Sequence, residues 1–242
     1  MRSLITTGVA GLSLAACLAW SPALLADEDW QDDDWDYASA EDPWENWNRK
    51  VFRFNETLDT YTLKPVAKGY RKVTPKPVRR SVRNFFGNLG EGKNLVNNLL
   101  QAKFHDAGVD TARFLFNTTF GVLGFFDVAT RMGLQRNDED FGQTLGKWGL
   151  PSGPYVVLPL LGPSTVRDAP ALVPDVYTTV YPYIKRDRYR YGLAGVELVS
   201  VRESLLDAED LLGTGDKYSM VRNVWLQNRE YKVLDGNVVD DF

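Results

Sequence analysis

Residues 42–58 read DPWENWNRKVFRFNETL, and this stretch sets the expected fold class of the chain. Its apolar side chains recur every three or four positions, which is the spacing of one face of an α-helix. They are Trp44, Trp47, Val51, Phe54 and Leu58, and Phe52 widens the stripe. Asp42 followed by Pro43 predicts an N-cap and a first helical position. The stretch therefore predicts an amphipathic helix, and such an apolar face most commonly packs against a core.

The segment that follows, residues 60–90, is strongly basic and contains no acidic residue. Pro65, Pro75 and Pro77 divide it into short helical pieces. Basic amphipathic helices suit anionic phospholipid headgroups, near which each Lys or Arg contributes about 1 kcal/mol. Nucleic-acid phosphates and plain solvent are the alternative surroundings of such a face. We expect a headgroup-facing surface made of Lys64, Lys68, Arg71, Lys72, Lys76, Arg79, Arg80 and Arg83.

Residues 87–93 match the first part of a phosphate-binding loop, G-x4-G-K. Asn94 stands where such a loop needs a Ser or Thr to hold magnesium, and no β-branched strand precedes the motif. We therefore expect these glycines to form a turn between two helices, of which the second covers residues 94–104.

Two uncharged stretches come next. Residues 114–126, FLFNTTFGVLGFF, predict a helix about 20 Å long, which is too short to cross a bilayer and is buried either in protein or in one leaflet. Residues 148–166, WGLPSGPYVVLPLLGPSTV, contain four prolines and predict a stiff, non-helical, apolar excursion. Because such a backbone needs protein or acyl chains against it, the excursion is a candidate wall or gate of an internal passage.

The remaining segments indicate a mainly helical, all-α fold. Residues 189–212 and 218–228 have helical spacing of apolar positions, whereas only residues 155–158 and 177–183 are strand candidates. We expect one helical domain over residues 43–234 and a short acidic tail at 235–242.

The first 26 residues predict export. The chain is uncharged from Ser3 to Ala26, and Leu-Ala-Ala-Cys17 behind a 13-residue apolar run is typical of a lipoprotein cleavage site with Cys17 as the lipidated residue. Three alternatives stay open: a signal peptide of residues 1–16, ordinary cleavage after residue 26, or a retained membrane anchor. Residues 17–42 are then an anchor and an acidic linker, with nine acids and no base between 27 and 42.

The composition excludes several kinds of chemistry. The 242 residues include one histidine, His105, and one cysteine, so zinc-finger, iron–sulfur and multi-histidine sites cannot form. Asp106 follows His105, but an adjacent His-Asp pair is a weak signal for a catalytic triad. We expect no enzymatic activity and no cofactor. We also expect no nucleic-acid partner, because an exported chain seldom meets nucleic acid.

Several motifs occur in order between residues 42 and 230, and together they resemble the VacJ/MlaA family. They are DPWENWNR (42–49), FRFN (52–55), KPVA (64–67), NFFGNL (84–89), GFFDVA (124–129), DFGQTLG (140–146), GPY (153–155), GPS (162–164) and RD (167–168). The resemblance implies a ring-like bundle of short amphipathic helices with a central channel, in the periplasmic leaflet of the outer membrane of a Gram-negative bacterium. It also implies removal of mislocalised phospholipid from the outer leaflet, with a trimeric porin and a periplasmic lipid-carrier protein as partners.

With that resemblance, we expect the opening helix and the proline-rich excursion to form opposing sides of a lipid path. The candidate path residues are Phe52, Arg53, Phe54, Asn55, Tyr155, Leu158 and Pro159. The alternative function is a membrane-surface adaptor that binds porin and transports no lipid.

Overall fold

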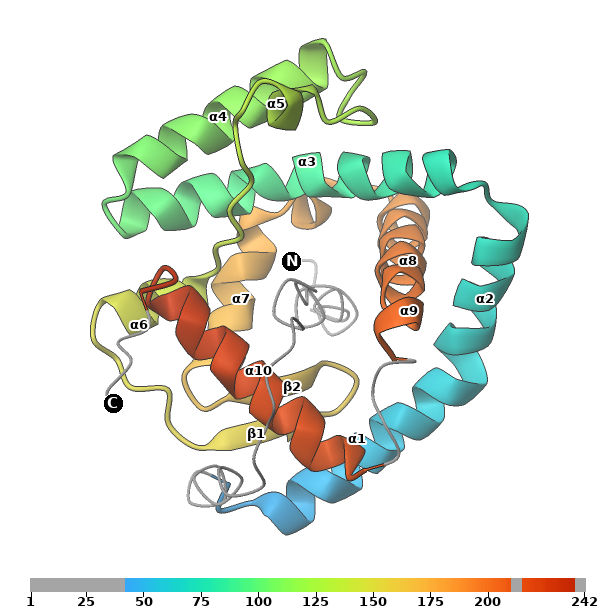
Figure 1. Ribbon diagram of the computed structural model, residues 1–242, viewed down its shortest axis with the longest axis vertical. Helices are drawn as coiled ribbons and strands as arrows, with labels where there is room; N and C mark the ends of the chain where they lie inside the picture. The colour runs from blue at the N-terminus through green and yellow to red at the C-terminus, as the bar shows by residue number, and fades with distance from the viewer. Residues whose placement is uncertain (1–41, 210–214, 238–242) are drawn as a thin grey trace, which may run out of the picture.

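The computed structural model describes residues 42–209 and 215–237, and its elements form a ring (Figure 1). The ring runs through α1 (Glu45–Leu58), η4 (Asp59–Leu63), α2 (Lys64–Val73) and α3 (Lys76–Leu100). It closes through α7 (Asp168–Thr178), a β-hairpin and α10 (Lys217–Val233). The predicted mainly helical, ring-like fold is confirmed. The predicted signal peptide, Cys17, the acidic linker and the end of the tail lie outside the described residues.

The first arm of the ring is one curved stretch of helix. The π-helical η4 joins α1 to α2 without a break, and the arm ends at Thr74, whose backbone is extended. A residue before proline disfavours the helical conformation, so the chain turns at Thr74 and Pro75 and starts α3 in a new direction. Three prolines were expected to divide this segment. Pro75 marks the break, whereas Pro65 and Pro77 lie in the first turns of α2 and α3.

α4 (Phe104–Thr119) packs against the outer side of α3, and a short α5 (Val128–Arg131) lies beside α4 (Figure 1). The seam between α3 and α4 is polar. Asn98 Nδ2 donates to Asp110 at 2.7 Å, and Arg113 Nε lies 2.8 Å from Glu91 Oε1. These two helices are therefore held together largely by buried hydrogen bonds and ion pairs.

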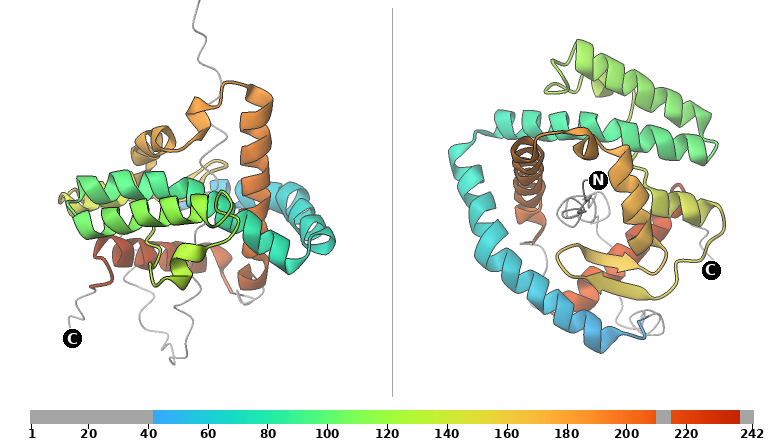
Figure 2. Two further views of the ribbon diagram at one scale, coloured as in Figure 1. Left: turned by 90° about the horizontal axis from the view of Figure 1, so that it is seen from above. Right: turned by 180° about the vertical axis from the view of Figure 1, so that it is seen from behind.

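The second half of the chain completes the ring. α6 (Phe141–Lys147) leads into the antiparallel hairpin of β1 (Tyr155–Leu158) and β2 (Gly162–Thr165), so the strand predicted at 155–158 is confirmed. After α7 and the 3₁₀ turn η5 (Tyr181–Tyr183) come α8 (Asp187–Ser204) and α9 (Leu206–Glu209). α8 stands across the plane of the ring, as the left view of Figure 2 shows.

The apolar core is small and lies where α1, the hairpin and α10 meet. It contains Val51, Tyr155, Val157 and Tyr218, with Phe52, Trp225 and Leu226 packed against it. Elsewhere in the described residues, buried polar and charged residues outnumber buried apolar ones, and many large apolar side chains are exposed. This is the reverse of the usual distribution in a globular domain. Within the described residues, none of the helices combines the length and apolar character that a bilayer crossing requires.

The predicted start of the first helix was wrong. α1 begins at Glu45, after Asp42 and Pro43. The Asp42 carboxylate accepts hydrogen bonds from Asn48 Nδ2 at 2.7 Å, from the Tyr218 hydroxyl and from Arg222 Nη1 at 3.3 Å. Its side chain therefore joins the start of α1 to α10 instead of capping the helix.

The predicted glycine turn was also wrong, because α3 continues from Lys76 to Leu100. A Cβ at Gly87 would lie 2.6 Å from Arg136 Nη1. The glycine leaves room for the Arg136 side chain, and residues 94–100 of the predicted second helix are instead the last turns of α3.

Two further segments differ from the predictions. α4 ends at Thr119, and the apolar stretch continues as a turn in which Val122 and Leu123 have φ of 52° and 58°. The polar face of α4 is the buried one, so the phenylalanines of this stretch do not form a core helix: Phe114, Phe120 and Phe126 are 42%, 70% and 54% exposed. The strand expected at 177–183 is instead the end of α7 and the turn η5, and the helix expected at 189–212 ends at Ser204 before α9.

Candidate functional site

A cavity of about 480 Å³ lies inside the ring. It is bounded by α1, η4, the hairpin, α7, the C-terminal half of α8 with α9, and α10. Much of its wall is apolar: Phe52, Leu58, Leu63, Val157, Leu160, Leu161, Pro163, Leu172, Leu198, Leu205, Val221, Val224 and Trp225. The size is that of a site for one small ligand or part of a larger one.

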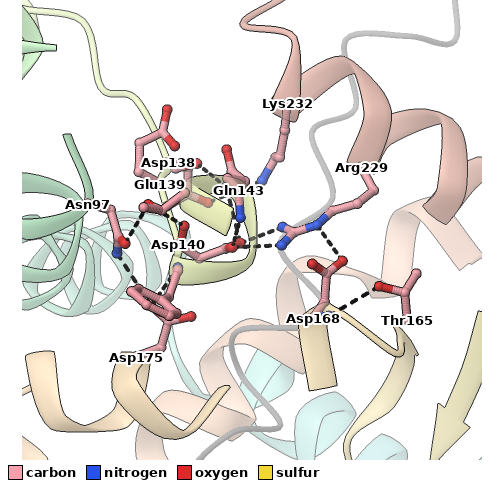
Figure 3. Close-up of polar contacts among 12 residues, drawn as sticks. Asn97, Asp138, Glu139, Asp140, Gln143, Thr165, Asp168, Asp175, Arg229 and Lys232 are labelled. Carbon is pink, nitrogen blue, oxygen red and sulfur yellow. Dashed lines mark hydrogen bonds and ion pairs between the residues drawn. The ribbon is translucent and has the colours of Figure 1, made fainter. Parts of the chain in front are cut away.

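One side of this wall carries a buried charge cluster centred on Arg229 of α10 (Figure 3). Its guanidinium binds Asp140 in a bidentate pair, at 2.5 and 2.7 Å, and binds Asp168 through Nε at 2.8 Å. Burial alone would raise the pKa of Asp140, but the charge of Arg229 outweighs it and holds that pKa below its usual range. The cluster thus places one guanidinium and its two acidic partners on the cavity wall.

The sequence permits this cluster because residue 142 is a glycine. A Cβ at Gly142 would lie 2.2 Å from Arg229 Nη2 and 2.4 Å from Asp168 Oδ1. Asp140 also caps α6 by accepting from Gln143 N at 2.9 Å. The DFGQ motif therefore serves both the helix start and the ion pair.

Asp175 of α7 lies on the same wall and accepts a hydrogen bond from Phe141 N at 2.9 Å. Asn97 approaches the same oxygen with its amide at 3.4 Å (Figure 3). Burial raises the pKa of Asp175 to about 6, so this carboxyl group titrates close to neutral pH.

A second charge cluster lies on the part of the wall formed by η4, α8 and α9. Arg202 binds both oxygens of Asp59 at 2.7 Å and binds Glu209 at 2.6 Å. Lys64 also binds Glu209, at 2.6 Å. The cavity therefore combines an apolar surface with two clusters in which arginine side chains are paired with carboxylates.

The candidate path residues of α1 have different surroundings. Phe52 and Asn55 line the cavity, whereas Arg53 and Phe54 are exposed, Phe54 by 54%. Asn55 donates to Leu158 O at 3.0 Å and accepts from Leu160 N at 2.8 Å, which fixes the tip of the hairpin.

The candidate residues of the hairpin are separated in the same way. Tyr155 is buried in the core, Leu158 is partly buried and Pro159 is exposed at the turn. Asn48 of α1 accepts from Val157 N at 2.8 Å and donates to Tyr155 O at 3.1 Å. α1 and β1 are therefore neighbours joined by hydrogen bonds, and together they supply one part of the cavity wall.

The basic surface predicted from residues 64–83 is divided by one buried carboxylate, Glu203. It pairs with Arg71 at 2.9 Å, with Arg83 at 3.1 Å and with Arg79, which is itself buried. Lys64 is held by Glu209. The members that remain exposed are Lys68, Lys72, Lys76, Arg80 and, beside Glu203, Arg83.

Within the described residues, no group of His, Cys, Asp and Glu side chains has the arrangement of a metal site. His105 is 89% exposed on α4 and contacts Asp106 at 2.9 Å. This geometry fits a surface histidine.

Sequence reasoning missed the pairing of Arg229 with Asp140 and Asp168, although DFGQ and RD were both recognised as motifs. It also missed Arg202, Asp59 and Asp175. The local sequence signal for this pairing was Gly142 inside the DFGQ motif. A glycine is needed there because the long Arg229 side chain of α10 occupies the space that a Cβ would fill.

The comparisons with known proteins agree with this geometry. A family model described as MlaA lipoprotein matches residues 40–232. The chain is similar to the intermembrane phospholipid transport system lipoprotein MlaA of Shigella flexneri, at 38% identity over 213 residues (84% of this chain and 82% of the relative). The corresponding protein of Escherichia coli K12 is 37% identical over 210 residues, with the same two shares.

A solved structure described as "Structural basis for maintenance of bacterial outer membrane lipid asymmetry" is also similar. It has 35% sequence identity and a TM-score of 0.70, and the match covers 79% of this chain and 98% of the solved one. An uncharacterized protein of Rickettsia typhi is 33% identical over 195 residues (79% of this chain and 78% of the relative).

Proposed function

The chain belongs to the MlaA lipoprotein family, and from this membership we infer that it transports phospholipid between the membranes of a Gram-negative envelope. We propose that it resides in the periplasmic leaflet of the outer membrane and removes phospholipid misplaced in the outer leaflet. It thereby maintains the lipid asymmetry of that membrane.

The observation that carries the proposal is the mixed character of the cavity inside the ring. A phospholipid has apolar tails and a charged headgroup. The leucine and valine side chains of the hairpin, α8 and α10 suit the tails, and the clusters around Arg229 and Arg202 offer charges of both signs to the headgroup.

The proposed mechanism is passive. The ring lowers the free-energy barrier for a phospholipid that leaves the outer leaflet, and no bond of the lipid is made or broken. The partners that we propose are a trimeric porin, against which the ring sits, and a periplasmic lipid-carrier protein, which receives the phospholipid.

A pair of tryptophan variants on α10 tests the passage. Val224→Trp places a large side chain on the cavity wall, whereas Gln227→Trp places the same side chain on an exposed position of the same helix. We expect outer-leaflet phospholipid to accumulate with Val224→Trp, as in a deletion strain, and to stay normal with Gln227→Trp. A folded, normally abundant Val224→Trp protein that restores lipid asymmetry would contradict the proposal.

The second candidate function is an adaptor that binds porin and moves no lipid. Analysis of the purified protein distinguishes this adaptor from a phospholipid transporter. Mass spectrometry of co-extracted lipid should find phospholipid with the wild type and less of it with Val224→Trp. Absence of bound phospholipid from both would favour the adaptor, and lipid hydrolysis products would indicate an enzyme.

For the membrane anchor we propose Cys17. Cys17→Ala should abolish metabolic labelling with fatty acid and leave uncleaved precursor or a product without the lipid. Residue 27 as the first residue of the mature wild-type protein would refute this assignment.

A further inference from the structure

A second cavity, of about 470 Å³, lies between α3 and the N-terminal half of α8. Its walls are Val82, Phe85 and Phe86 of α3, Leu193 and Val196 of α8, and Phe125 of the turn after α4. Phe85 stacks on Phe125 with ring centroids 5.1 Å apart. We call this cavity the α3–α8 slot. It shares no lining residue with the cavity inside the ring.

Arg188 and Tyr189 form the polar end of the slot. Arg188 Nη2 lies 3.0 Å from the Tyr189 hydroxyl, and its guanidinium carbon lies 4.7 Å from the centre of the tyrosine ring. Within the described residues, Arg188 forms no ion pair, whereas Arg79, Arg202 and Arg229 all bind carboxylates. An exposed guanidinium next to a phenol therefore stands at the end of an apolar slot.

The surroundings of Arg188 are also positively charged. Residues 183–191 read YIKRDRYRY, with four basic residues and one acid. That acid, Asp187, already binds Arg190 at 2.6 Å. The start of α8 rises out of the plane of the ring (left view of Figure 2), so its cations lie away from the charge clusters of the central cavity.

The slot also borders exposed apolar surface through Phe125. Phe125 belongs to the turn whose neighbours Val122, Leu123 and Phe126 are 58%, 59% and 54% exposed. A patch of this kind is unfavourable in water and suits acyl chains. The slot thus joins an apolar surface to a cationic end.

We propose that the α3–α8 slot holds one anionic phospholipid of the surrounding membrane, separate from the lipid that passes through the ring. An acyl chain lies against Phe85, Phe125 and Leu193, and the phosphate accepts hydrogen bonds from Arg188 and Tyr189. Charge complementarity selects an anionic lipid, because Arg188 forms no ion pair within the described residues and the one acid of residues 183–191 is already paired. The bound lipid fixes the start of α8 against α3.

Gly192 provides a direct test, because it lines the slot and a Cβ built there meets no atom within 4 Å. Gly192→Phe fills the slot from within α8. Gly195→Phe is its control, since Gly195 is equally open but does not line the slot. For the charge, Arg188→Glu is compared with Lys185→Glu, which makes the same change at an exposed residue that does not line the slot.

The full-length protein, reconstituted into vesicles that contain a photoactivatable phosphatidylglycerol, is cross-linked and mapped by mass spectrometry. We expect cross-links in residues 82–86 and 188–196. Gly192→Phe and Arg188→Glu should each lower their yield about tenfold, and both controls should retain it. Phosphatidylcholine carrying the same photoactivatable chain should label these segments weakly. Val224→Trp, which blocks the central cavity, should leave the labelling unchanged, so failure of the proposed function and failure of the slot are distinguishable.

Three results would overturn the proposal. Equal losses with Lys185→Glu and Arg188→Glu would show diffuse attraction by the basic segment. Equal labelling by phosphatidylcholine would remove the anionic selectivity. Loss of labelling with Val224→Trp would place the labelled lipid in the central cavity. If Gly192→Phe alters the melting temperature, the comparison of Arg188→Glu with Lys185→Glu decides the outcome by itself.

Discussion

Asp110 of α4 provides a pH-dependent test of the polar seam between α3 and α4. Its side chain is fully buried and accepts one hydrogen bond, from Asn98 Nδ2 at 2.7 Å. The second oxygen of Asp110 and the amide oxygen of Asn98 are both buried without a hydrogen-bond partner in the described residues. Protonation of Asp110 would remove the charge of this buried carboxylate and turn one of its two oxygens into a donor. Burial accordingly raises the pKa of Asp110 to about 7.

The sign of the effect on stability follows from this shift. The folded state binds the proton more tightly than the unfolded state, in which the pKa is close to 3.8. The stabilisation is therefore fully present below about pH 4 and is lost as the pH rises to 7. Between pH 5 and pH 7 the loss is about 2 kcal/mol, because each unit corresponds to about 1.4 kcal/mol and the group is still half protonated at its folded-state pKa.

Asp110→Asn removes the titration and supplies a permanent amide donor. We expect the variant to gain about 3 kcal/mol of unfolding free energy relative to the wild type when the pH is raised from 5 to 8. The measurement is urea denaturation of the purified protein in a non-ionic detergent at several pH values. Asp106→Asn on the same helix, at a side chain that is 44% exposed, is the control and should show little change. A difference between wild type and Asp110→Asn that is independent of pH would refute the reasoning.

Three other predictions concern stability and membrane binding. Glu203→Gln should lower the unfolding free energy by about 3–5 kcal/mol, because it leaves buried arginine charge without a partner. The control Asp207→Asn changes an 80% exposed side chain that also binds Arg71 and should cost less than about 1 kcal/mol. Equal losses of unfolding free energy would contradict the buried pairing. Gly121→Ala should lower the unfolding free energy by more than about 2 kcal/mol, because its Cβ would lie 2.1 Å from Phe126 O. Gly108→Ala on the open side of α4 is the control and should be neutral or stabilising. Similar melting temperatures of the two variants would be inconsistent with the contact at Gly121. Arg80→Glu should weaken sedimentation of the protein with anionic vesicles, more at low salt than at high salt; binding that is unchanged at low salt would return this exposed arginine to a solvent-facing role.

The fold class followed from local patterns, and the errors arose where a distant residue changed a local rule. The stripe from Trp44 to Leu58 is helical, and the proline-rich excursion does contain a non-helical hairpin. Asp-Pro predicted a helix start, but Asp42 is used by partners 176 and 180 residues away. The glycines after residue 86 predicted a turn because Arg136, which needs the space, is not visible in the local sequence.

The same reason limited the prediction of the site. A charge count over residues 60–90 finds bases without acids, yet Glu203, the acid that binds three of them, lies 120 to 132 residues further along the chain. Asp140 and Asp168 are 89 and 61 residues from Arg229. Hydrophobic spacing predicts which face of a helix is apolar, but it carries no information on which charged side chains meet across a ring.

Arginines that are paired with carboxylates and an arginine that is not suit two different tasks in this protein. A passage must bind its cargo weakly enough to release it. In the central cavity, Arg229 and Arg202 already satisfy two carboxylates each, so a passing headgroup gains little by displacing them. Arg188 has no carboxylate partner within the described residues, and its side chain contacts the Tyr189 hydroxyl and ring instead. An arginine neutralised by carboxylates therefore favours passage, whereas an exposed arginine beside an apolar slot favours retention, and the slope of each binding step against salt should differ accordingly.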